Sequence, residues 1–383
     1  MKILELGKFY PIRGGVEKVM WDLARGISAR GIDCDMLCAM LPGDRFDEAD
    51  SARGTVDGSM RTITFNEHGH CYCVKALKKV AATMISPAMV GWLRKHKAEY
   101  DVIHVHHPDP MACLALWLSG YRGKVVLHWH SDILKQKGLL TLYRPLQSWL
   151  IRRADLIVGT TPVYVAQSHA LAGVQDKVTY LPIGIEDNIR SASGTESEEA
   201  GQHRVTVFSL GRLVEYKGFE YLIDAAQYLP DNYRVLIGGK GPLMEQLQQR
   251  IDSLGVNVKL LGFLSDGQVY DLYNTSDLFV LSSVMKTEAF GIVQIEAMSC
   301  GKPVVATHIP GSGTDWVNAD GESGLNVPCR DPRALADAIV KICGDSDVYA
   351  RFSAGARSRY EKLYTYQGMI DGAVAFYEKV LEK

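Results

Sequence analysis

Two glutamates, Glu288 and Glu296, stand eight residues apart in a segment that follows an apolar strand pattern and leads into a helical one. On a helix this spacing gives a rise of about 12 Å, with the side chains offset by about 80°. That span is comparable to a sugar and a ribose joined by a diphosphate. The spacing therefore predicts one carboxylate at each end of a molecule of that length.

The surroundings of Glu296 are apolar: Ile292, Val293, Ile295, Ala297 and Met298. An unpaired charge there is costly, so a hydroxyl or cationic partner is expected, and ribose hydroxyls would serve. A structural lysine, or a side chain facing solvent, is the open alternative. At the helix start, Gly291 permits close backbone approach, and the free amides there favour a diphosphate, with Ile292 as a further donor-binding candidate.

Two cations, Arg212 and Lys217, follow an apolar strand within the segment from Leu210 to Gly218. Arginine presents a bidentate fork and lysine a point charge, a combination suited to phosphate oxygens on a departing group. These residues therefore predict a grip on a diphosphate. A solvated turn with two surface cations is the alternative.

Glycines and a histidine mark the ends of other predicted strands. Gly14 and Gly15 follow the first strand and could bring backbone amides to a phosphate, although a plain turn would also explain them. His130 lies where a strand runs into a loop, at the edge where open α/β sheets bind ligands. It is a candidate sugar contact, with a histidine hydrogen-bonded in the core as the alternative.

Two clusters carry side chains that could bind metal: histidines within 104–107, and histidines with cysteines within 68–73. In each cluster the side chains are too closely spaced to close a tetrahedral site, and no second pair with zinc spacing completes it. The sequence therefore predicts no metal and no bound cofactor.

Strand patterns alternate with helical patterns twice along the chain, which predicts two parallel, doubly wound α/β domains. The expected strands of the first are Met1–Leu6, Cys34–Met40, Asp101–His106, Lys124–His130 and Leu156–Thr160, with a helix at Val16–Ala29. Those of the second are Val205–Leu210, Arg234–Ile237, Val258–Leu260, Leu278–Leu281 and Pro303–Ala306.

The expected boundaries are 1–188 for the first domain and 204–365 for the second. Between them, 189–203 is rich in Ser, Gly, Thr and Glu and poor in core-forming residues, which is typical of a linker. The last apolar-periodic stretch, Tyr366–Leu381, has no position that spacing alone can assign.

Composition limits the partners. The 383 residues carry a formal net charge of −2, which provides no global field to recruit nucleic acid. Eight scattered cysteines and an opening without a cleavable signal pattern predict a reduced, cytoplasmic chain. No apolar run reaches the roughly 20 residues that a bilayer-spanning helix needs.

One region of the first domain has a basic and apolar composition suited to an anionic membrane surface. An ordinary solvated helix pair is the alternative. The residues are Lys75, Leu77, Lys78, Lys79, Val80, Met84, Trp92, Arg94, Lys95 and Lys97.

Four segments in this order resemble the retaining GT-B glycosyltransferases of family 4, and the resemblance covers nearly the whole chain. They are Gly14 to Glu17, Gly211 to Gly218, Glu288 to Glu296, and Asp320 to Leu325. The resemblance implies two Rossmann-like domains with a cleft between them, and a C-terminal helix, 366–383, that packs back on the first domain. It also implies transfer of a hexose from a nucleoside diphosphate sugar to a glycan or lipid-linked acceptor in cell-surface polysaccharide assembly, with retention and without a metal.

By the same resemblance, His130 lies near the transferred sugar and Gly15, beside Gly14, near the donor diphosphate. Arg212 and Lys217 would hold phosphate oxygens, and Glu288 the hydroxyls of the donor sugar. The remaining implied donor contacts are the backbone of Phe290, Gly291 and Ile292, and Glu296 at the ribose. Lys240 and Ser312 depart from common family residues, so UDP and GDP donors both stay open.

Two other functions are compatible with this architecture. A nucleotide-sugar epimerase would need no acceptor, and a non-catalytic sugar-binding scaffold would bind without turnover. The joint presence of the glutamate pair and the cation pair favours the transferase.

Overall fold

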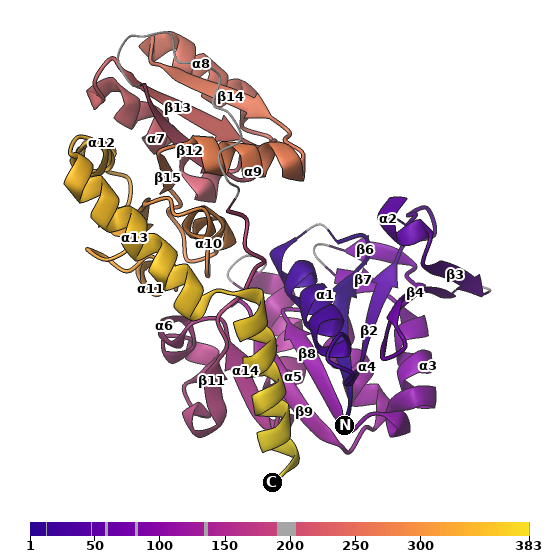
Figure 1. Ribbon diagram of the computed structural model, residues 1–383. Coiled ribbons are helices and arrows are strands. Elements are labelled where there is room, and N and C mark those ends of the chain that lie inside the picture. The colour runs from indigo at the N-terminus through magenta and orange to yellow at the C-terminus, as the bar shows by residue number, and fades with distance from the viewer. Residues whose placement is uncertain are drawn as a thin grey trace. The chain divides into compact units, whose positions relative to one another are not determined.

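The computed structural model describes residues 1–12, 14–46, 48–57, 60–80, 83–133, 137–189 and 204–382. The chain divides into two compact units (Figure 1), Met1–Ile183 with Met369–Lys383, and Gly184–Gly368. Nearly all of the predicted linker, 190–203, lies outside the described residues.

The boundary before the predicted linker differs from the expected one, because residues 184–188 belong to the second unit. Ile185 exchanges backbone hydrogen bonds with Tyr364 and Tyr366, at 2.9 and 2.8 Å. Asp187 forms an ion pair with Arg357 at 2.5 Å. These contacts tie the segment to residues far along the chain, which sequence spacing does not reveal.

The first unit contains a nine-stranded sheet in the order β11-β10-β9-β8-β1-β2-β5-β4-β3. From β11 to β5 neighbouring strands are parallel, whereas β4 and β3 form an antiparallel edge. The bounds are β1 Lys2–Phe9, β2 Asp33–Met40, β3 Gly54–Asp57, β4 Met60–Asn66, β5 Gly69–Lys75, β8 Val102–His107, β9 Lys124–Trp129, β10 Leu156–Gly159 and β11 Val178–Tyr180. The parallel strands predicted from the sequence are all present, but the edge formed by β3, β4 and β5 was not predicted.

Two helices of the first unit begin at a residue whose side chain caps the helix. The Ser86 side chain accepts a hydrogen bond from the amide of Met89 at the start of α3 (Pro87–His96). Asp109 does the same for two amides of α4 (Pro110–Ser119). In both helices proline occupies the first turn, where its missing N–H removes no helical hydrogen bond. The other helices are α1 Gly15–Ser28, α2 Glu48–Ser51, α5 Lys137–Arg153 and α6 Pro162–Ala166.

The C-terminal helix α14 spans Tyr366–Leu381, and its residues from Met369 onward belong to the first unit. The hydroxyl of Tyr377 donates to Glu5 on β1 at 2.7 Å and lies 2.6 Å from His104 Nδ1 on β8. The chain therefore returns to the first sheet through a buried polar contact as well as apolar packing.

The second unit contains a six-stranded sheet, parallel throughout, in the order β14-β13-β12-β15-β16-β17. The bounds are β12 Val205–Leu210, β13 Tyr233–Gly238, β14 Val258–Gly262, β15 Leu278–Leu281, β16 Val304–His308 and β17 Gly324–Pro328. Five of the six were predicted. Strand order reverses between β12 and β15, and ligands bind outside the carboxyl ends of strands at such a point.

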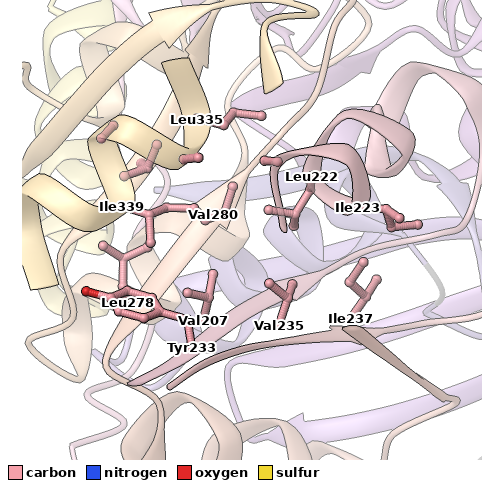
Figure 2. Packing of buried hydrophobic residues seen from close by; sticks show 14 of the residues in the cluster. Val207, Leu222, Ile223, Tyr233, Val235, Ile237, Leu278, Val280, Leu335 and Ile339 are labelled. Atoms are coloured by element: carbon pink, nitrogen blue, oxygen red, sulfur yellow. The ribbon is translucent and has the colours of Figure 1, made fainter. Parts of the chain in front are cut away.

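Side chains alternate along these strands, so apolar residues pack against helices on both faces of the sheet. Figure 2 shows Val207, Val235 and Val280 packed against Leu222 of α7 (Phe219–Ala225) and Ile339 of α12 (Pro332–Cys343). On the other face, Phe208 and Phe279 contact the ring of Tyr273 in α9 (Asp266–Thr275). Strands covered on both faces read as continuous apolar runs, which is why they were predictable. The remaining α-helices are α8 Met244–Leu254, α10 Ile292–Ser299, α11 Thr314–Val317 and α13 Ser346–Leu363.

Membrane-spanning capacity can be judged from the helices. Within the described parts of the chain, none is both long and apolar enough to cross a bilayer.

Candidate functional site

The predicted site residues divide between the two units. Gly14, Gly15 and His130 belong to the first unit, and Arg212, Lys217, Glu288, Phe290, Gly291, Ile292 and Glu296 belong to the second.

The centre of the second-unit site is an ion pair between two buried side chains. Lys217 Nζ lies 2.5 Å from Glu288 Oε2, and both side chains are about nine-tenths buried, with 11% exposed. Lys217 ends the short 3-10 turn after β12, and Glu288 follows β15. The structure thus brings together two residues that the sequence predicted separately, 71 positions apart.

The two loops that carry this pair are joined by their backbones. The amide of Val284 donates to Tyr216 O at 2.8 Å, and Ser282 Oγ donates to Lys217 O at 2.9 Å. Gly218 has a φ of 61°, and a Cβ there would lie 2.3 Å from Ser282 O. Only glycine adopts this positive φ without strain and also has no Cβ to collide with the carbonyl of Ser282. The close contact between the two loops therefore depends on Gly218.

The charged side chains around this ion pair influence one another's pKa values. Burial disfavours the ammonium of Lys217, but the opposite charge of Glu288, with a weaker contribution from Glu296, raises the pKa of Lys217. Burial raises the pKa of Tyr216, which also experiences the charges of Lys217, Glu288 and Arg212. Arg212, Lys217, Glu288 and Tyr216 therefore form one electrostatic cluster.

Arg212 differs from Lys217 in having its side chain exposed to solvent. Within the described ranges its guanidinium has no hydrogen-bonding or ion-pairing partner. The loop that carries Arg212 packs closely against the loop that contains Gly239. Gly239 has a φ of 127°, and a Cβ there would lie 1.9 Å from Gly211 O. An arginine at this edge of the sheet can bind an anion without first breaking an internal ion pair.

Glu288 is positioned by two serines that the sequence analysis did not assign to this role. Ser283 Oγ donates to Glu288 Oε2 at 2.8 Å, and Ser312 Oγ donates to the backbone carbonyl of Glu288 at 2.5 Å. Ser312, noted as a departure from common family residues, thus fixes the backbone at the candidate sugar-binding carboxylate. The serine pair directly after the predicted strand Leu278–Leu281 was the available signal for Ser283.

Glu296 is half-buried on α10, and Tyr273 of the neighbouring α9 donates its hydroxyl to Glu296 Oε2 at 2.8 Å. Burial, followed by the nearby charge of Glu296, raises the pKa of Tyr273 well above its usual value. A hydroxyl partner for Glu296 therefore exists inside the protein, on Tyr273. Whether Glu296 also binds ribose stays a prediction.

The segment between the two glutamates forms the start of α10. Gly291 caps the helix with a φ of 76°, and a Cβ there would lie 2.8 Å from the side-chain nitrogen Nε2 of Gln294. Phe290 is buried, and its carbonyl accepts a hydrogen bond from Gln294 at 3.1 Å. Ile292 is the first helical residue, so its amide is among those without an intrahelical acceptor. This end of the helix can accept an anion.

In the first unit, Gly14 and Gly15 form the start of α1 after β1, as the sequence predicted for a turn between strand and helix. A Cβ at Gly14 would lie 2.3 Å from Glu17 Oε2, so a larger residue would have to displace that carboxylate. The role of the two glycines in donor binding stays a prediction.

His130 follows β9 and belongs to a buried row of hydrogen bonds. His130 Nε2 lies 2.9 Å from His106 Nδ1, and His106 Nε2 lies 2.5 Å from Glu5 Oε2. Burial opposes the charged form of Glu5, yet His104 and His106 lower the pKa of Glu5 below its usual range. Glu5 is therefore an ionised acceptor, which the sequence showed only as one charge in an apolar strand.

The direction of each hydrogen bond follows from that charge. Burial lowers the pKa of His106 to about 4 and that of His130 well below its usual value, so both rings are neutral near pH 7. His106 then donates from Nε2 to Glu5 and accepts at Nδ1 from His130 Nε2. This leaves Nδ1 of His130 as a hydrogen-bond acceptor, suited to a hydroxyl.

Family models match both units of the chain. The model described as Glycosyltransferase Family 4 matches residues 13–188, and the model described as Glycosyl transferases group 1 matches residues 195–359. Together they span both sets of predicted site residues.

Two curated relatives match over nearly their full lengths. The O-antigen chain mannosyltransferase C of Escherichia coli is 31% identical over 100% of this chain and 99% of its own. The D-rhamnosyltransferase WbpZ of Pseudomonas aeruginosa is 30% identical over 95% of this chain and 92% of its own.

Solved structures show the same architecture. HepE from Anabaena, solved with UDP, superposes with a TM-score of 0.76 at 20% identity, over 99% of this chain and 100% of its own. The sucrose-phosphate synthase of Thermosynechococcus elongatus superposes with a TM-score of 0.75 at 18% identity, over the whole of both chains. The fold is therefore GT-B, and the chain is a glycosyltransferase. It belongs to glycosyltransferase family 4, as the ordered segments predicted.

The buried ion pair predicts an asymmetric stability effect. Lys217→Met leaves Glu288 buried without its cation and should destabilise the second unit by about 3 to 5 kcal/mol, because breaking a buried pair exposes the full desolvation cost. The double variant Lys217→Met with Glu288→Gln should recover much of that loss. Hydrogen exchange at the amides of β12 measures the free energy of opening.

The matched control is the exposed pair of Arg333 and Asp337 on α12, with side chains 67% and 61% exposed. Arg333→Met should change the free energy by less than about 1 kcal/mol. A Lys217→Met effect no larger than that of Arg333→Met would show that the Lys217–Glu288 contact does not contribute as a buried pair.

Proposed function

We propose that this glycosyltransferase moves a hexose-type sugar from a UDP- or GDP-linked donor to a hydroxyl of a glycan or lipid-linked acceptor, in the assembly of a cell-surface polysaccharide. The two curated relatives described above are named as an O-antigen chain mannosyltransferase and a D-rhamnosyltransferase. A manno-configured sugar and an O-antigen-type acceptor are therefore the first choices.

The observation that carries this proposal is the Lys217–Glu288 pair beside the unpaired Arg212. If Lys217 holds a phosphate oxygen and Glu288 a sugar hydroxyl, their contact marks the sugar–phosphate junction of the donor. Arg212 and the amides at the start of α10 add positive potential for the charge that develops as the diphosphate departs. In this proposal Lys217, Arg212 and the amides at the start of α10 all stabilise the departing diphosphate.

The same geometry supports retention without a covalent sugar–enzyme intermediate. A double displacement needs a carboxylate nucleophile with a second acid or base nearby. Glu288 Oε2 already accepts from Lys217 and Ser283, which makes it a poor nucleophile. The departing diphosphate would instead take the acceptor proton, with attack on the face from which it leaves. Protein cations supply the charge stabilisation, so we propose that transfer needs no metal.

Within this scheme His130 stays the predicted contact of the transferred sugar, with Nδ1 accepting a hydroxyl hydrogen. Glu5 and His106 are positioning residues, because they set the tautomer of His130 without contacting substrate. Glu296 is proposed to bind ribose through the carboxylate that Tyr273 orients.

The test is turnover with a panel of UDP- and GDP-linked hexoses, with and without a lipid-linked glycan acceptor. We expect acceptor-dependent release of the nucleoside diphosphate, an α linkage by NMR from an α-linked donor, and a fall in kcat of at least about 100-fold for Glu288→Gln. Glu245→Gln, at an exposed position of α8, is the control and should leave kcat unchanged.

Each alternative has its own outcome. A β linkage would contradict retention, and a sugar captured on Glu288 would contradict the single-step scheme. A sugar epimer formed without acceptor would identify the epimerase. Binding of donors without any product would identify the scaffold.

We also propose that the hairpin formed by β6 (Lys78–Val80) and β7 (Thr83–Ile85) contacts an anionic membrane surface. Leu77 and Val80 are 64% and 41% exposed, and Lys78 and Lys79 are exposed beside them. The helix pair considered as the alternative is instead the antiparallel pair β6 and β7 followed by α3, and Trp92 of α3 is half-buried against Tyr72 and His96. The segment 77–80, with exposed Leu77 and Val80 beside the two lysines, is the better candidate.

Flotation with anionic vesicles tests this contact. Reversing Lys78 and Lys79 to glutamate should reduce the bound fraction severalfold, since each lysine contributes about 1 kcal/mol near such a surface. Lys341→Glu, at an exposed position of the second unit, should not. Equal flotation of all variants would remove the hairpin from consideration.

A further inference from the structure

Three cysteine side chains meet in the core of the first unit, at the point where its sheet changes from parallel to antiparallel. Cys38 lies on β2, and Cys71 and Cys73 lie on β5. Cys38 and Cys73 are directly abreast on these parallel strands, and Cys71 stands two residues earlier on the same face as Cys73. All three are at most 1% exposed.

The three sulfur atoms form a nearly equilateral triangle. The Sγ–Sγ distances are 3.6 Å for Cys38–Cys73, 3.7 Å for Cys71–Cys73 and 3.8 Å for Cys38–Cys71. A zinc–thiolate bond is about 2.3 Å long, so two thiolates on a tetrahedral zinc lie about 3.8 Å apart. The triangle already has the dimensions of one face of a zinc–thiolate tetrahedron.

We propose that Cys38, Cys71 and Cys73 form a three-thiolate site for a thiophilic cation, with Zn²⁺ as the expected occupant. Binding would replace the three thiol protons with three metal–sulfur bonds, and the protons would pass to solvent. Soft thiolate ligands select zinc and similar ions over magnesium or calcium. The site is structural, since it joins β2 to β5, and it is separate from the metal-free transfer chemistry.

A fourth ligand has a route to the ion. Cys73 borders a cavity of about 260 Å³ whose lining also includes Met40, Arg61 and Lys75. Arg61 pairs with Cys73 across β4 and β5, which places both side chains on one face. A water entering from this cavity can complete four-coordination, and the two cations offset the excess negative charge of three thiolates on Zn²⁺.

A second group with metal-binding chemistry, His104, His106 and His128, has ring nitrogens within 4.8 Å of one another. Both nitrogens of His106 already hold partners, His130 and Glu5. A metal there would have to break that row, whereas the side-chain contacts of the three thiols are with one another. Close spacing within 68–73 and the lack of a second pair with zinc spacing argued against a metal there, but the third thiol, Cys38, comes from a strand 33 residues earlier.

The experiment measures zinc in the intact chain. Protein produced with added zinc and freed of loose metal by gel filtration should contain about one zinc per chain, released by a mercurial reagent in step with thiol modification. Cys38→Ser should retain less than about a tenth of it. Cys34→Ser is the matched control, because Cys34 is an equally buried thiol on the same strand.

A readout that needs no variant guards against loss of folding. Apo protein titrated with Co²⁺ should develop a thiolate-to-cobalt charge-transfer band that saturates at one equivalent and disappears when zinc is added. Wild-type protein with less than a tenth of a zinc per chain, and no such band, would overturn the proposal. So would equal zinc loss in Cys34→Ser and Cys38→Ser, or a disulfide among the three cysteines in the purified chain.

Discussion

The ion pair between Lys217 and Glu288 is the constraint on which the second-unit site depends. Two charges in a nearly closed environment are tolerated only when each satisfies the other, so the loops after β12 and β15 must stay in register. The backbone contacts between those loops, the glycine at 218 and the serines on Glu288 all serve that register. Arg212, after the carboxyl end of β12, is exposed to solvent and can therefore bind an incoming anion.

Topology explains why these residues meet. The strand order reverses between β12 and β15, so their carboxyl ends lie side by side at one edge of the sheet although about 70 residues separate them. In the first unit the strand order reverses between β1 and β8, and the row from Glu5 to His130 runs from β1 across β8 to the residue after β9. One architectural rule therefore accounts for both sets of predicted site residues.

Much of this could be predicted from the sequence. Strands buried on both faces appear as largely apolar runs. Leu278–Leu281 is apolar throughout, and Val205–Leu210 is interrupted only by Thr206 and Ser209; both were predicted to the residue. The antiparallel edge of β3 and β4 was missed because its residues are only partly buried and mix polar with apolar types. Partners such as Tyr273 for Glu296, Ser312 for Glu288 and Cys38 for Cys73 were missed for another reason. They are joined by tertiary packing across elements, which leaves no local periodic signal.

The most direct test of the account is the affinity for a free nucleoside diphosphate, measured by titration calorimetry with UDP and GDP. Arg212 follows the carboxyl end of β12, and Arg204, also exposed, precedes its amino end. A charge-assisted contact is worth about 1.5 to 3 kcal/mol, so Arg212→Ala should weaken binding of the preferred nucleotide at least tenfold, with Arg204→Ala within about twofold of wild type. Equal affinity in Arg212→Ala and Arg204→Ala would contradict the claim that the donor diphosphate binds at the carboxyl ends of β12 and β15.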